Sequence, residues 1–320
     1  MLKDILRNFP KQFSWEPKVV NEKFLHSKES FVVCGMGGSH LSADIIDMLL
    51  PEADISVHRD YGLPHITNPD KTMVIASSYS GNTEETIDAL NTAIKNKIQC
   101  AVVTKGGKLI EIAQKNNLPY IKLPDIESQP RFFLGYNFVS ILKLMGKNSL
   151  LNQAGILAEK LDPKKAEERG VELAKKLQDK IPVIYSSAKY GAASYIWKIK
   201  FNETSKIPAF CNEFPELNHN EMNGFDTKEK TIPLMEKFHF VFLKDADDDP
   251  RIIKRMEVMR NLLEKQELKV EVLTLEGESQ MHKIFDSLMV ADFASYNLAE
   301  FYCNDPEQVP AVEEFKKLIA

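Results

Sequence analysis

Short apolar runs alternate with longer amphipathic stretches along the whole chain. In the first half, the apolar runs that predict strands are residues 31–34, 55–58, 73–76, 100–103 and 120–123. Helical spacing of apolar positions follows two of these runs, at 41–50 and 84–95. Strands that alternate with helices pair in parallel, so this half is expected to form a parallel sheet covered by helices.

A helical region from Phe133 to about Leu177 leads into a second alternation of the same kind. Its expected strands are 182–185, 238–243 and 270–275, and its expected helices are 192–203, 251–265 and 284–302. A chain of 320 residues is long enough for two domains of about 150 residues each. We therefore predict an α/β fold of two tandem sandwich domains, at 1–150 and 151–320.

Composition narrows the class of protein. The mixture of 43% hydrophobic and 27% charged residues is typical of a globular protein, and the net charge of −5, with Lys and Arg spread along the chain, disfavours a nucleic-acid partner. We expect no signal peptide and no membrane span, because no apolar stretch is long enough. Widely spaced cysteines predict reduced core residues and a cytoplasmic protein; they are Cys34, Cys100, Cys211 and Cys303.

The stretch Ser77–Thr83 connects a predicted strand to a predicted helix and is rich in hydroxyl groups. A phosphate at this point would meet free helix N–H groups, the positive end of the helix dipole and several hydroxyl donors. A simple helix cap needs one hydroxyl, whereas this stretch offers four, at Ser77, Ser78, Ser80 and Thr83. Anion binding is therefore favoured over a plain cap.

A second glycine-rich turn, Gly35–Ser39, follows the first predicted strand. It lacks the spaced third glycine of a dinucleotide-binding loop, and the next strand ends with His58 and Arg59 rather than an acidic residue. These departures disfavour a nicotinamide enzyme.

Together the two turns resemble those of the sugar isomerase (SIS) domain, which grips phosphosugars through a Ser/Thr-rich loop. Four further stretches are similar to the bifunctional phosphoglucose/phosphomannose isomerase family: Arg59–Tyr61, Gln129–Arg131, Asp249–Arg251 and Phe214–Glu221. The resemblance covers nearly the whole chain, and the last stretch is its most specific part. Both domains are accordingly expected to be of the SIS type.

The resemblance implies an aldose–ketose isomerase that interconverts glucose 6-phosphate and fructose 6-phosphate through a cis-enediolate, without a metal or a redox cofactor. It implies that Glu203 is the base, that His219 opens the sugar ring from a neighbouring subunit of a homodimer, and that Arg131 faces the enediolate. Lys316, on an expected helix at 309–319, would assist at the ring oxygen, although Lys317 is adjacent and leaves the register open. The expected phosphate and sugar contacts are Gly37, Gly38, Ser39, Ser78, Ser80 and Thr83.

The residues themselves support these roles unequally. His219 lies among polar residues outside any periodic segment, which favours proton transfer, whereas Glu203 and Arg131 alone would pass for surface residues. Two positions depart from the family: His40 replaces a glycine, and the stretch 307–309 lacks the threonine associated with mannose activity. Glucose 6-phosphate is therefore the safer substrate.

Several alternatives remain open from the sequence. The acidic run Asp245–Asp249 before Pro250 is interpreted as a helix N-terminus rather than a metal site. A glutamine-dependent amidotransferase would need an N-terminal cysteine domain, for which the first thirty residues are too short. A non-catalytic sugar-phosphate sensor would have no need of both Glu203 and His219, and a regulator would need an added DNA-binding module.

Overall fold

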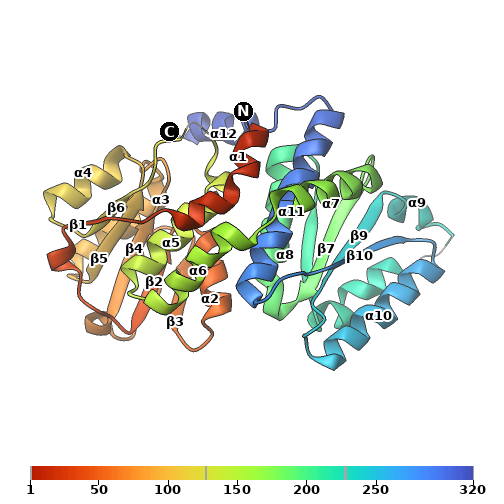
Figure 1. Ribbon diagram of the computed structural model, residues 1–320, viewed down its shortest axis with the longest axis horizontal. Coiled ribbons are helices and arrows are strands. Elements are labelled where there is room, and N and C mark those ends of the chain that lie inside the picture. The colour runs from red at the N-terminus through yellow and green to blue at the C-terminus, as the bar shows by residue number, and fades with distance from the viewer. Residues whose placement is uncertain (1, 127, 227–228, 320) are drawn as a thin grey trace. The chain divides into compact units, whose positions relative to one another are not determined.

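The computed structural model describes residues 2–126, 128–226 and 229–319. Lys3–Leu161 form one compact unit, and the chain from Asp162 onward forms a second. The boundary expected at 150/151 falls inside helix α6 (Asn148–Lys160), which packs against α5 (Leu134–Leu144) and the 3-10 segment Phe9–Ser14 of the first unit. Each unit is an α/β sandwich with a central sheet, as Figure 1 shows, so the predicted fold class is confirmed.

The first unit contains a six-stranded sheet in the order β1-β6-β5-β4-β2-β3. All neighbours pair in parallel except β1 with β6. The five strands expected from the sequence are present, and β1 is an additional short edge strand. The bounds are β1 Val19–Val20, β2 Ser30–Cys34, β3 Asp54–His58, β4 Thr72–Ser77, β5 Gln99–Thr104 and β6 Tyr120–Lys122.

Helices α3 (Glu84–Lys95) and α4 (Gly107–Lys115) cover one face of this sheet through alternate apolar side chains of β2, β4 and β5. Helix α2 (Leu41–Leu49) packs on α5, which also contacts β5. Short α1 (Leu2–Arg7) precedes them. The sequence does not predict helix α4, because Gly106 and Gly107 are typical of the end of a strand.

The second unit contains a four-stranded, fully parallel sheet in the order β10-β9-β7-β8. Its strands are β7 Ile181–Ser187, β8 Phe210–Phe214, β9 Phe238–Lys244 and β10 Lys269–Thr274. Strand β8 was not predicted, because its middle residues are partly polar and it lies at the sheet edge. The helices that pack around this sheet are α7 Pro163–Lys176, α8 Gly191–Lys200, α9 Ile232–Met235, α10 Pro250–Lys265 and α11 Gln280–Phe301. The exposed helix α12 Pro310–Ile319 follows them in the chain.

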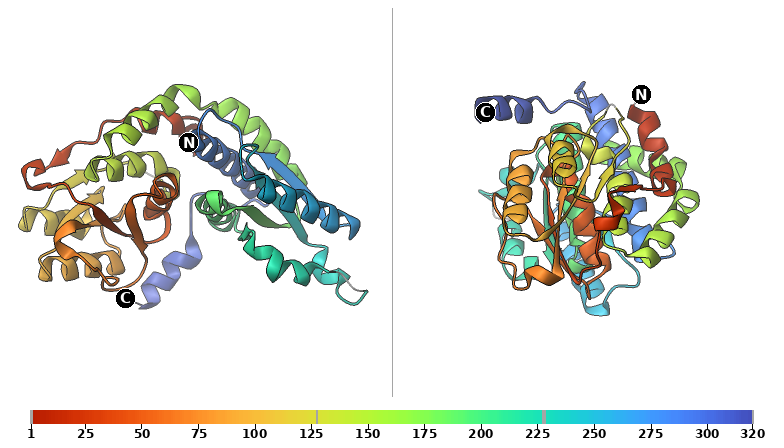
Figure 2. Two further views of the ribbon diagram at one scale, coloured as in Figure 1. Left: turned by 90° about the horizontal axis from the view of Figure 1, so that it is seen from below. Right: turned by 90° about the vertical axis from the view of Figure 1, so that its left-hand side faces the viewer.

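Helix α11 is the central helix of the second unit and lies beside α7 and α8 (Figures 1 and 2). Most of its 22 residues are buried, and Ser279 caps its start by accepting a hydrogen bond from the His282 amide at 3.2 Å. This cap places the helix start four residues before the expected position. Of the helices described, none is both long and apolar enough to cross a membrane.

The cysteines are only partly where the sequence placed them. Cys34 and Cys100 lie buried in β2 and β5, and burial raises the pKa of each thiol to about 12. Cys211 is half-buried, and Cys303 is exposed. The expectation of a core position is therefore wrong for Cys303, which follows the end of α11 in a left-handed conformation.

The carboxyl ends of β7 and β9 carry a buried ionic cluster around Asp245. Its carboxylate accepts hydrogen bonds from Lys283 Nζ at 2.6 Å, Tyr190 OH at 2.7 Å and Lys189 Nζ at 2.9 Å. Burial alone would raise the pKa of Asp245, but these donors hold it well below its ordinary value. The stabilisation is therefore present above about pH 4 and is lost as the pH falls further.

The rest of the acidic run makes two further long-range contacts and one helix cap. Asp247 pairs with Lys283 at 2.6 Å, and Asp248 accepts a hydrogen bond from Ser187. Asp249 caps α10 by accepting a hydrogen bond from the Arg251 amide at 2.8 Å, and Pro250 occupies the first turn of that helix. This geometry confirms the helix N-terminus expected from the sequence.

Replacing Lys283 with methionine should lower the free energy of unfolding by about 2–4 kcal/mol, because the buried Asp245 carboxylate loses a buried cation. Lys165→Met is a matched control, since Lys165 pairs with Glu276 at 2.6 Å where both side chains are about half exposed. It should cost less than about 1 kcal/mol. Urea unfolding followed by circular dichroism measures both, and equal losses would contradict the ranking.

Candidate active site

Two turns of the first unit meet at the carboxyl ends of the adjacent strands β2 and β4. Ser39, in the turn after β2, joins them: its Oγ accepts a hydrogen bond from the Tyr79 amide at 3.1 Å. Its carbonyl accepts from Ser77 Oγ at 2.8 Å and from Asn137 Nδ2 at 2.8 Å. The two predicted turns therefore form one rigid unit, in which Ser77 is a structural hydroxyl.

The turn after β4 presents its hydroxyl groups at the N-terminus of α3. Ser78 Oγ and Thr83 Oγ1 are 2.8 Å apart, and the Gly81 amide donates to Ser78 Oγ at 3.2 Å. Ser80 is exposed and its Oγ accepts from the Asn82 amide at 3.2 Å. Thr83 occupies the N-cap position without making a side-chain cap. The first amides of α3 are therefore available to an anion.

Gly81 makes this turn possible. Its φ of +72° is left-handed, and a Cβ there would lie 1.8 Å from the Gly106 carbonyl oxygen. Gly107, at the start of α4, packs back against the same turn, since a Cβ there would lie 2.5 Å from the Ser80 carbonyl oxygen. Gly106 and Gly107, which obscure the start of α4 in the sequence, are therefore needed for the conformation of the turn after β4. We call this turn, Ser77–Thr83, the phosphate turn, after the ligand that the sequence predicts for it.

Arg131 lies next to the turn after β2. It belongs to the 3-10 segment Pro130–Phe132 and is only 2% exposed, with its guanidinium 4.6 Å from the Phe132 ring centroid. A Cβ at Gly38 would lie 2.9 Å from the Arg131 amide nitrogen, so glycine permits this close approach. The structure thus brings Gly37, Gly38, Ser39 and Arg131 together, and a buried cation there suits an anionic ligand.

His40 is buried, and its Nδ1 lies 2.6 Å from the Asp44 carboxylate one turn further along α2. The same carboxylate accepts a hydrogen bond from Arg59 Nη2 at 2.9 Å. Arg59 belongs to one of the stretches singled out in the sequence. His40 therefore joins a polar network that ties α2 to the end of β3.

Glu203 lies in the second unit, in a π-helical turn Phe201–Ser205 that continues α8. The residue is partly buried. The sequence predicted an ordinary helix to this residue, but the α-helix ends at Lys200. Single π turns are rare and occur frequently at functional sites.

His219 ends the 3-10 segment Glu216–His219 and is exposed. Its neighbours are held firmly: Leu217 is fully buried, and Asn218 Oδ1 accepts a hydrogen bond from Arg255 Nη1 at 3.3 Å. Glu221 accepts hydrogen bonds from Tyr185 within β7 and from Asn212 within β8. The segment is thus anchored on both sides of His219, and the imidazole is presented to solvent.

Lys316 and Lys317 are both exposed on α12, so exposure does not distinguish which of the two lysines is the site residue. Glu203, His219 and Lys316 lie on three separate elements of the second unit.

Sequence reasoning missed Asn137 as a support for the first unit's turns. Its position inside an apolar helical run was the available signal, since a buried amide needs partners.

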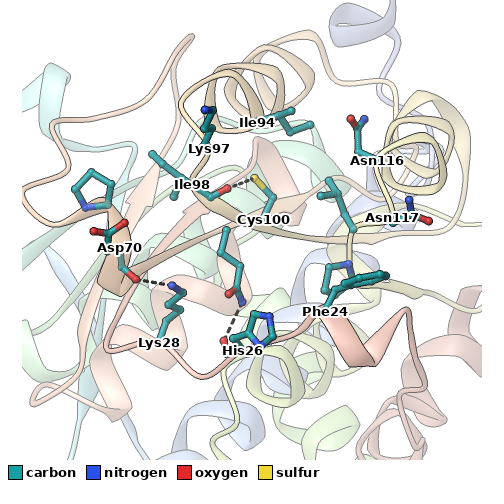
Figure 3. A pocket seen from close by; sticks show the side chains of 14 residues that line it. Phe24, His26, Lys28, Asp70, Ile94, Lys97, Ile98, Cys100, Asn116 and Asn117 are labelled. Atoms are coloured by element: carbon teal, nitrogen blue, oxygen red, sulfur yellow. Dashed lines mark hydrogen bonds between the residues drawn. The ribbon is translucent and has the colours of Figure 1, made fainter.

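A cavity of about 530 Å³ lies at the opposite end of the first sheet (Figure 3). Segments that precede β2, β4, β5 and β6 form its walls, so it opens at the amino ends of these strands. Lys28 donates to the Asp70 carbonyl there, and Gln99 Nε2 donates to the His26 carbonyl at 2.8 Å. It is therefore separate from the phosphate turn.

Comparison with known proteins identifies structures of the same fold and a matching family. The glucosamine-6-phosphate deaminase structure from Thermotoga maritima superposes with a TM-score of 0.72 at 16% identity, covering 97% of each chain. Residues 166–319 match the family model described as bacterial phospho-glucose isomerase C-terminal SIS domain. The fold and this match thus define a protein of the tandem SIS-domain class.

Relatives of similar length narrow the class. Proteins named bifunctional phosphoglucose/phosphomannose isomerase are 33% identical in Caldicellulosiruptor bescii, over 91% of this chain and 90% of that protein, and 32% identical in Aquifex aeolicus, over 98% and 96%. The chain belongs to the bifunctional phosphoglucose/phosphomannose isomerase family.

Replacing Ser80 and Thr83 together with alanine should weaken binding of a phosphosugar at least about tenfold, because hydrogen bonds to a charged group are lost. Titration calorimetry with glucose 6-phosphate measures the dissociation constant. The double variant Ser56→Ala/Thr67→Ala removes two exposed hydroxyls elsewhere in the unit and should bind normally. Unchanged affinity in the first variant would refute the phosphate turn.

Proposed function

We propose that the protein is an aldose–ketose isomerase that interconverts glucose 6-phosphate and fructose 6-phosphate by proton transfer. The observation that carries the proposal is the hydroxyl-lined N-terminus of α3, which Ser39 joins to the turn that packs against the buried Arg131, in a chain of this family. A phosphate anchor and a buried cation are what an enediolate mechanism requires of its binding site.

In this proposal the phosphate binds the first amides of α3 and the hydroxyls of Ser78, Ser80 and Thr83. The backbone of Gly37, Gly38 and Ser39 lines the sugar. Because Gly81 and Ser39 fix both turns, the anchor is formed before substrate arrives. Binding energy from the phosphate then holds the reacting carbons in place.

Glu203 is the proposed base. Its carboxylate takes the proton from C2 of the open-chain aldose, the electron pair of that C–H bond forms the C1–C2 double bond, and the carbonyl π electrons move onto O1 to give a cis-enediolate. A proton passes from the O2 hydroxyl to O1, the same carboxyl returns its proton to C1, and O2 becomes the carbonyl oxygen of the ketose. Arg131 stabilises the negative charge that develops on the oxygen.

His219 is proposed to open the pyranose ring, with Lys316 at the ring oxygen. An exposed imidazole on an anchored segment suits a residue that acts on a ligand held elsewhere, so we propose that it enters the site of a second copy in a homodimer. Mannose 6-phosphate is a second candidate substrate, supported by the names of the relatives. An assay with each aldose decides it.

The reaction would serve glycolysis and gluconeogenesis in the cytoplasm. Four free cysteines, two of them buried with raised thiol pKa values, are consistent with a reducing compartment.

Glu203→Gln should lower kcat for glucose 6-phosphate by about a hundredfold to ten-thousandfold, because general base catalysis contributes that much. Calorimetric binding of the substrate should persist, since the phosphate turn is untouched. In deuterated water the wild-type product should carry deuterium from exchange at the base. Glu300→Gln, at an exposed position on α11, is the matched control and should be fully active. A nearly active Glu203→Gln enzyme would rule out this base.

A shared site predicts complementation between two inactive variants. Glu203→Gln and His219→Ala proteins, mixed and allowed to exchange subunits, should recover about one quarter of the wild-type activity, because half the dimers are hybrids with one intact site each. Mass spectrometry of isotope-labelled subunits reports the exchange. Hybrid dimers without activity would show that each subunit supplies its own histidine.

A further inference from the structure

Lys206 follows the π turn of Glu203 in a left-handed conformation, with φ +58°. This is the position at which helices usually carry glycine, because a side chain there strains the backbone. Lys206 is one of seven described non-glycine residues with a positive φ, so its conformation alone assigns it no role, and the contacts of its side chain decide the matter.

The Lys206 ammonium group turns back over the end of the π turn. Nζ donates to the Glu203 carbonyl at 2.9 Å and to the Thr204 carbonyl at 3.3 Å. Carbonyl groups at a helix C-terminus lack partners within the helix and carry the negative end of its dipole. A cation at this point therefore satisfies the backbone of Glu203 itself and of the residue after it.

The same ammonium group also donates to the Asp305 carbonyl, far away in sequence. A second bond joins these segments, because Asn304 Nδ2 donates to the Ser205 carbonyl at 2.9 Å. Asp305 then organises the chain that continues to α12: its Oδ1 accepts from the amides of Glu307 and Gln308 at 2.8 and 3.3 Å. The segment before Lys316 is thus fastened to the turn that carries Glu203.

We propose that Lys206 is a positioning residue that fixes the π turn of Glu203 and docks the 304–308 segment onto it. The inference rests on the proposed role of Glu203 as the base. One ammonium group then sets both the direction of the base and the starting point of the helix that carries Lys316. A shift of about 1 Å in the position of the Glu203 carboxylate or of the Lys316 ammonium group is enough to slow catalysis about a hundredfold.

Lys206→Met should lower kcat about tenfold to a hundredfold while KM changes less than about twofold, because the phosphate turn belongs to the other unit. Lys206→Arg, which keeps a cation able to reach the carbonyls, should restore much of kcat. Lys206→Gly relieves the left-handed strain but removes the side chain, so it should lose activity as Lys206→Met does. Lys97→Met is the matched control: Lys97 is exposed and has the same φ of +58°.

Amide hydrogen exchange gives a readout that does not depend on activity. In Lys206→Met, amides in 201–207 and in 302–309 should both exchange faster than in the wild type. Asn304→Ala should produce the same pattern more weakly, and it is the variant to use if Lys206→Met folds poorly. Normal kcat in folded Lys206→Met, an equal loss in Lys97→Met, or unchanged exchange in both segments would overturn the proposal. An active Glu203→Gln enzyme would instead remove the proposed base, whatever the exchange data show.

Discussion

The phosphate turn depends on the close approach of the backbone at Gly81 to the carbonyl of Gly106. No side chain fits this contact, since a Cβ would lie 1.8 Å from that oxygen. The contact fixes the path of the chain between β4 and α3, so Ser78 and Thr83 face each other at the uncapped helix end. Hydroxyls and helix amides are therefore organised by backbone packing, before any ligand is bound.

The second sheet, β10-β9-β7-β8, repeats the order of four strands of the first sheet, β5-β4-β2-β3, but the residues that follow the corresponding strands differ. The pair β2 and β4 corresponds to the pair β7 and β9, and the strands of each pair are neighbours. Where the first unit has hydroxyls after β4, the second has Asp245 after β9, surrounded by Lys283, Lys189 and Tyr190. These three side chains already donate hydrogen bonds to the Asp245 carboxylate, which takes the place that a ligand anion would need. The proposed anion site therefore lies in the first unit, while the second unit carries the proposed base and the histidine.

The sequence predicted what depends on local apolar pattern and missed what depends on packing. Buried strands such as β4 are continuous apolar runs and were located to within about a residue or two at each end. Strand β8 and helix α4 were missed because an edge strand tolerates polar residues and a helix can begin at a glycine whose conformation another turn requires. The π turn at Glu203 and the burial of Arg131 follow from long-range contacts that no local pattern records.

The segment Phe214–Glu221 shows why a motif can identify a family mainly through residues that do no chemistry. Phe214 and Leu217 are fully buried in the core of the second unit. Asn218 and Glu221 use their polar groups to tie the segment to α10 and to the strands β7 and β8. Only with these anchors in place does an exposed His219 have a defined position. Several buried or hydrogen-bonded residues are thus needed to hold one exposed side chain in place, so most residues of the motif determine the conformation of the segment.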